Sequence, residues 1–87
     1  MQIIEDKETG EVLIYPFQEM VHTPSSHQPR LRISRPKSEW QIAGIVFDGF
    51  SPSSASWNKD AAREIARALD KAIEIAEAID LKQEVKL

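Results

Sequence analysis

The chain has 87 residues, a formal net charge of −3 and no cysteine. A chain of this length forms one domain that buries roughly 60 to 65% of its unfolded surface, and because its core is thin we expect a homodimer. The missing cysteines exclude a disulfide framework, a zinc site with thiolate ligands and a thiol nucleophile. The N-terminal residues lack the pattern of a signal peptide, and no apolar run approaches the roughly 20 residues of a membrane span. We therefore expect a soluble cytoplasmic protein.

The first part of the chain predicts a β-hairpin. Residues 2–5 alternate weakly, and residues 11–17, EVLIYPF, are rich in the β-branched and aromatic residues that favour strands. The polar stretch DKETG between them ends in Gly10, which can supply the positive φ of a turn. Pro16 cannot donate a ladder hydrogen bond, so it places its end of the strand at an edge or a bulge. Residues 23–29, TPSSHQP, are a loop by composition.

Two further strands are expected after this loop. Residues 30–34, RLRIS, alternate with Leu31 and Ile33 on one face and the arginines on the other, which indicates a half-buried strand. The stretch RPKSE then predicts a turn. Residues 40–48, WQIAGIVFD, form a second strong strand, long enough to lie centrally in a sheet. Gly44 within it indicates a bulge or a close approach of another backbone.

Residues 58–81, NKDAAREIARALDKAIEIAEAIDL, predict one amphipathic helix without Gly or Pro. Asn58 is its expected N-cap, and Trp57 is placed to pack back as a hydrophobic staple. Asp80 falls within the apolar arc, so we expect regular packing to stop near Ile79. The alanines favour a helix with a packed face, or alternatively a seam between two helices of a dimer. At 100° per residue, half of the circumference holds Ile65, Ile75, Ala68, Ile79, Ala72, Ala76, Leu69, Ala62, Ile73 and Ala66.

The expected fold is therefore α+β: a four-stranded antiparallel meander sheet followed by one long C-terminal helix packed on one face. We assign residues 1–87 to a single domain, with the sheet at 2–57, the helix at 58–81 and a polar tail at 82–87. The face of the sheet opposite the helix is then free. Function is expected on that face.

No motif for catalysis or for metal binding is present in the sequence. Serines stand at positions 25, 26, 51, 53, 54 and 56, but none lies in a nucleophile-elbow pattern. His22 and His27 share a loop without a third ligand at a workable spacing, and the acidic residues around the first turn lack the calcium-loop spacing. No glycine-rich phosphate loop occurs. We expect no enzyme activity, no metal and no cofactor.

One segment of the chain is basic. Between residues 22 and 37 there are four basic residues and no acidic one. Outward guanidinium groups at Arg30 and Arg32 can pair with phosphates, and Tyr15, Phe17 or Trp40 can stack on bases. In the alternative, the aromatic rings lie in the core and the arginines pair with carboxylates of nearby glutamates, Glu11, Glu19 or Glu39. The predicted nucleic-acid-binding residues are Arg30, Arg32, Arg35, Lys37, Tyr15 and Trp40.

The order of four strands, a loop and the helix that begins SWNKDAAREIARAL resembles the single-stranded-DNA-binding modules of the PC4, PUR and Whirly type. The resemblance covers most of the chain in topology. It implies a homodimer that holds single strands on a curved sheet surface, with the basic residues at 30, 32, 35 and 37 as the positions carried over.

Two functions follow as hypotheses. The first is a small non-catalytic module that binds single-stranded nucleic acid through the outer face of its sheet, with an affinity that falls steeply as salt is added. The second is a homodimeric protein-interaction or regulatory module, of the kind found among small phage and plasmid proteins, that binds another protein and no nucleic acid. The acidic helix surface and the short length favour the second.

Overall fold

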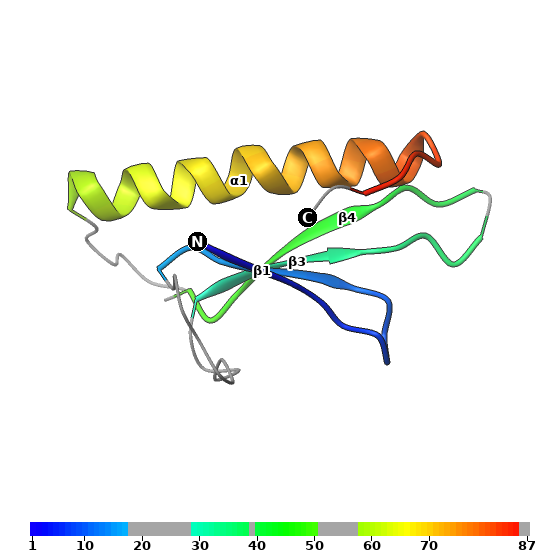
Figure 1. Cartoon of the computed structure of the whole chain (residues 1–87), viewed down its shortest axis with the longest axis horizontal. Helices are drawn as coiled ribbons and strands as arrows, with labels where there is room; N and C mark the ends of the chain where they lie inside the picture. The colour runs from blue at the N-terminus through cyan, green and yellow to red at the C-terminus, as the bar shows by residue number, and fades with distance from the viewer. Residues whose placement is uncertain (18–28, 39, 51–57, 86–87) are drawn as a thin grey trace.

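The computed structural model describes residues 1–17, 29–38, 40–50 and 58–85. Its elements are β1 (Gln2–Glu5), β2 (Val12–Tyr15), β3 (Arg30–Ser34), β4 (Gly44–Asp48) and α1 (Lys59–Asp80). The strands form one antiparallel sheet in the order β1-β2-β3-β4, and α1 lies along one side of it (Figure 1). The predicted α+β meander with a C-terminal helix is confirmed.

The core lies between α1 and the middle of the sheet. Val12 pairs with Ile33 and Ile14 with Leu31, so these four fully buried side chains form one patch on the face toward the helix. The period of two along β2 and β3 places them there. Fully burying side chains of this size contributes about 1.5–3 kcal/mol each. From the helix, the patch is covered by Ala68, Ala72, Ile75, Ala76 and Ile79.

The turn between β1 and β2 is held by its own polar groups. The Asp6 carboxylate accepts hydrogen bonds from the backbone N–H groups of Glu8 and Thr9, and the Gly10 N–H donates to the Asp6 carbonyl. Gly10 has a φ of 77°, the left-handed conformation expected from its place in the turn. The polar turn and the positive φ of Gly10 therefore agree with the hairpin that the sequence predicts.

Both ends of α1 are capped. The Asn58 side chain accepts from the Ala61 N–H, which satisfies one of the free donors of the first turn. At the other end Lys82 has a φ of 55°, its N–H donates to the Ile79 carbonyl, and the Gln83 N–H donates to Ala78. This left-handed closure ends the helix without a glycine. The predicted start is confirmed, and Ile79 is the last buried residue of the helix. The expected polar tail is not wholly polar in its contacts, because Val85 packs against the core.

Two predicted strands have different limits in the structure. β2 ends at Tyr15 and not at residue 17, because Pro16 has no N–H to continue the ladder. β4 begins at Gly44 and not at Trp40, since the Gln41 N–H donates to the Ser38 carbonyl in a turn. Gly44 is thus the first residue of the strand and not a bulge inside it.

β4 is also not central. The last strand of a meander has a neighbour on one side only, and within the described ranges β4 pairs with β3 alone. The expected central position was therefore incompatible with the expected topology. Several predictions fall on residues outside the described ranges: the staple at Trp57, the histidines at 22 and 27, the loop at 23–28, the partners Glu19 and Glu39, and the serines at 25, 26, 51, 53, 54 and 56.

Candidate interaction surface

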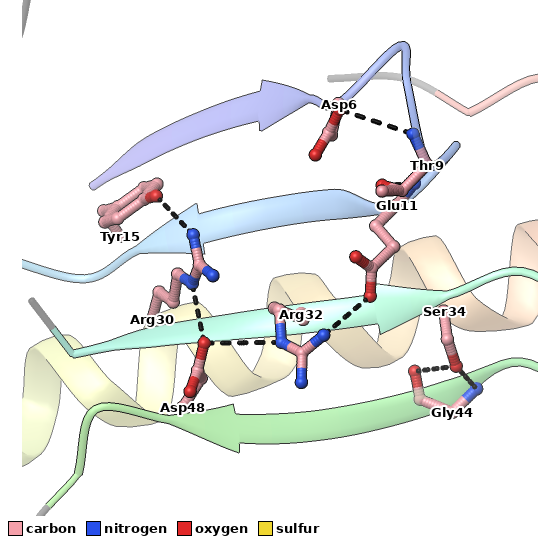
Figure 2. Close-up of polar contacts among 9 residues, drawn as sticks. All are labelled: Asp6, Thr9, Glu11, Tyr15, Arg30, Arg32, Ser34, Gly44 and Asp48. Carbon is pink, nitrogen blue, oxygen red and sulfur yellow. Dashed lines mark hydrogen bonds and ion pairs between the residues drawn. The ribbon is translucent and has the colours of Figure 1, made fainter. Parts of the chain in front are cut away.

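The face of the sheet opposite α1, here called the outer face, carries a chain of alternating charges (Figure 2). Asp48 on β4 accepts from Nε of Arg30 at 2.9 Å. The same Oδ2 atom lies 3.4 Å from Nε of Arg32, an ion pair without hydrogen-bond geometry. Arg32 Nη1 in turn donates to Glu11 Oε2 at 3.1 Å. The two positive charges of the outer face are thus matched by two carboxylates.

The strand register brings these charges together. Arg30 stands directly opposite Asp48, and Arg32 lies two residues further along the same face of β3. Glu11 immediately precedes β2, where Val12 pairs with the neighbour of Arg32. The alternative in which the arginines pair with glutamates is thus met at Glu11, whereas its expectation that Trp40 lies in the core is wrong. A phosphate bound to either guanidinium would have to compete with a carboxylate that is already in place.

Tyr15 is the second partner of Arg30. Arg30 Nη1 donates to the Tyr15 hydroxyl at 3.0 Å, and the guanidinium carbon lies 6.0 Å from the ring centroid. The hydrogen bond with Tyr15, followed by the contacts with Asp48, raises the pKa of Arg30 above its ordinary value, while burial opposes the rise. Tyr15 is only 3% exposed. Its ring supports Arg30 and does not offer a free surface on which a base could stack.

The remaining predicted binding residues lie away from this network. Arg35 donates from Nε to the Gly10 carbonyl at 2.7 Å and forms an ion pair with Glu5 at 3.4 Å, which ties the end of β3 to the first turn. Lys37 and Trp40 belong to the connection between β3 and β4. The structure therefore brings Arg30, Arg32 and Tyr15 together but does not place the six predicted residues in one cluster.

The sequence interpretation named Trp40 as an exposed aromatic residue, but it missed the other exposed apolar side chains of β4 and of the segment before it. Trp40 is 94% exposed, Ile42 79% and Phe47 56%, and Val46 is 38% exposed. Val46 lies on the outer face opposite Arg32, whereas Phe47 lies on the helix side opposite Leu31. A strand at the centre of this sheet would bury its helix-side apolar residues under α1. At an edge the same residues are exposed.

One flank of the apolar arc of α1 is exposed as well. Ala62, Ala66 and Ile73 are exposed and Leu69 is half-buried, although all four belong to the predicted dry side of the helix. Asp80 continues this line of the helix, and its carboxylate accepts from the Ala43 N–H at 2.7 Å. Because Ala43 directly precedes β4, the exposed flank of α1 lies toward the edge of the sheet that β4 forms.

These residues together form what we call the β4-edge surface. It combines the exposed apolar side chains of β4 and of the segment before it with the open flank of α1. Figure 1 shows the start of β4 beside the C-terminal half of α1, with the two elements diverging toward the start of the helix. The members of the β4-edge surface are Trp40, Ile42, Val46, Phe47, Ala62, Ala66, Leu69 and Ile73.

Other kinds of site find no support in the residues that the structure describes. Among them, no group of three or more His, Asp or Glu side chains could hold a metal ion. None of the described helices is long and apolar enough to cross a membrane. No protein-family model, no curated protein and no solved structure matches the chain.

Proposed function

We propose that this chain is a non-catalytic protein-interaction module that acts as a homodimer through its β4-edge surface. The observation that carries the proposal is the gathering of large exposed apolar side chains along one open edge of the sheet. On the outer face, by contrast, the charges of Arg30 and Arg32 are matched within the chain. Large apolar side chains that stay exposed in one region of a soluble protein mark an interaction site when they form a patch.

The open edge strengthens this proposal. An edge strand presents free N–H and C=O groups on which another strand can pair, and natural proteins usually protect such an edge with charge, proline or a covering element. β4, with the sequence GIVFD, has no lysine and no proline, and its only charged residue, Asp48, is occupied by Arg30 and Arg32. An edge without these protections is expected to be covered by a protein.

The test is the mass of the chain in solution. Multi-angle light scattering, measured from low to high micromolar concentration, is expected to give twice the 9.9 kDa mass of one chain. Nuclease treatment and added salt should leave that mass unchanged, because the proposed contact is apolar. A mass of one chain at every concentration would overturn the proposal.

Binding of single-stranded nucleic acid is the second candidate. It is favoured by one observation: Arg30 and Arg32 lie side by side on the face that α1 leaves uncovered (Figure 2). It predicts that a fluorescent oligonucleotide binds at low ionic strength, that added salt weakens binding steeply, and that Arg32→Gln weakens it further. If no oligonucleotide binds at low ionic strength, this candidate is removed while the homodimer is unaffected.

A further inference from the structure

The direction of the backbone groups along β4 can be followed from two contacts. The Gly44 N–H points toward β3, where it donates to Ser34 Oγ at 3.2 Å. The preceding N–H, that of Ala43, points the other way and donates to Asp80. Since this direction alternates along a strand, the backbone groups of Ile45 and Phe47 point away from the sheet. Among the residues that the structure describes, the free part of the edge therefore begins after Ala43.

We propose that the second copy of the chain pairs its own β4 antiparallel with this β4, about a twofold axis at Val46. The two sheets then continue as one sheet across the dimer. This inference rests on the proposed homodimer and specifies its contact. A twofold arrangement requires a surface that is complementary to itself, and the sequence of β4 meets that requirement.

In this register every β4 residue has a compatible partner. Ile45 stands opposite Phe47 of the second copy, and both residues direct their N–H and C=O groups outward, as a hydrogen-bonded pair requires. Val46 meets Val46 of the second copy, and Asp48 meets Gly44. Apolar residues thus oppose apolar residues, and the two carboxylates do not face each other.

The neighbouring registers fit less well. An axis at Ile45 would place Phe47 opposite Ala43, whose N–H is already bound by Asp80. An axis at Phe47 would place Val46 opposite Asp48 of the second copy and leave Gly44 unpaired. The clamp between Ala43 and Asp80 therefore helps to fix the register at Val46.

Five residues of strand are too few for a stable interface, because specific contacts bury about 1,200–2,000 Å² in total. The open flank of α1 supplies further area. Its residues are spaced by four, three and four positions, the spacing of a helix–helix seam, and two of them are alanines that let backbones approach closely. The four residues are Ala62, Ala66, Leu69 and Ile73.

The opposite edge of the sheet, β1, does not offer the same surface. Ile3 and Ile4 are half-buried, and no residue of β1 is among the large exposed apolar side chains of the described chain. Glu5 at its end is already paired with Arg35. β1 is therefore a suitable control for the properties of an edge strand in general.

Single cysteines test the register, because the chain has none of its own. Val46→Cys is compared with Ile4→Cys, its control on the outer face of β1. Residues opposite each other in a non-hydrogen-bonded pair have Cα atoms about 4.5 Å apart, within the range of a disulfide. Under mild oxidation at low concentration, Val46→Cys is expected to give mostly covalent dimer and Ile4→Cys mostly monomer. Equal cross-linking of the two variants would overturn the proposed axis.

A charge at the axis provides the second test. Val46→Glu places two carboxylates against each other in the dimer, while within one chain the new carboxylate faces Arg32, so the fold is expected to persist. Light scattering should show this variant as a monomer with native circular dichroism, and Ile4→Glu as a dimer. If Val46→Glu does not fold, the comparison of Val46→Cys with Ile4→Cys tests the proposed axis.

The results separate the two proposals. A dimeric native chain whose Val46→Glu variant is also dimeric, without cross-linking of Val46→Cys, would refute the β4 pairing and leave the homodimer standing. A monomeric native chain would refute both.

Discussion

Asp48 is the residue on which the outer face depends. Its Oδ2 atom is shared by Arg30 and Arg32, which would otherwise stand as two like charges on alternate positions of one strand. Glu11 and Tyr15 each hold only one of the two arginines. The carboxylate of Asp48 therefore binds both arginines and offsets the repulsion between their positive charges. The cost of losing it is expected to exceed that of losing a single exposed ion pair.

Replacing Asp48 with asparagine tests this role. Asp48→Asn keeps the size and one acceptor oxygen but removes the charge, and we expect the free energy of unfolding to fall by about 1 kcal/mol, since partly exposed ion pairs are screened by water. Urea unfolding at low salt measures it, and the loss should shrink as salt is added. Glu74→Gln, which breaks the exposed pair with Lys71 on α1, is the matched control and should change little. Equal effects of the two substitutions would contradict the shared role of Asp48.

At the scale of elements, the periodicity of the sequence is sufficient to predict the range of an element when one of its faces is buried and the other is exposed. β3 matches its predicted range because Leu31 and Ile33 alternate with arginines, and α1 matches because its caps and its apolar spacing agree. The predicted central position of β4 is wrong because an apolar run gives the same sequence pattern in a central strand and in an edge strand that binds a partner. The expected meander, in which the last strand lies at an edge, distinguishes the two.

The candidate site was predictable only in part. Glu11 was named with Glu19 and Glu39 as a partner of the arginines in one alternative, but the sequence did not say which arginine it would hold. The role of Asp48 was missed, since it depends on the register between β3 and β4. The open flank of α1 could not be read from the helix alone either. Its apolar arc spans half of the circumference, and how much of that arc the sheet covers depends on where the helix axis lies.

At the scale of the molecule, the buried core is a single layer of side chains between one helix and the two middle strands. A chain of this size buries only about 60–65% of its unfolded surface, so the free energy of unfolding of a single chain is expected to be small. On the helix side, Phe47 and the open flank of α1 lie beside this layer. A second copy seated there would enlarge the core of both chains, which links the stability of the fold to association.

This link predicts that thermal unfolding depends on concentration. If folding and dimer formation are coupled, a tenfold rise in concentration stabilises the dimer by about 1.4 kcal/mol, or about 0.7 kcal/mol per chain. Since about 1 kcal/mol moves the unfolding midpoint of a domain of this size by about 4–8 °C, the midpoint should rise by about 3–6 °C for each tenfold rise in concentration. Circular dichroism measured on a dilution series gives this dependence.

Two variants show whether this concentration dependence comes from pairing at β4. Val46→Glu should unfold at a lower midpoint that no longer changes with concentration, because its folded form is a single chain, whereas Ile4→Glu should keep the slope of the native chain even if its midpoint is lower. A native midpoint that stays constant over a hundredfold range of concentration would mean that the thin core is sufficient by itself. The exposed edge of β4 would then need another explanation.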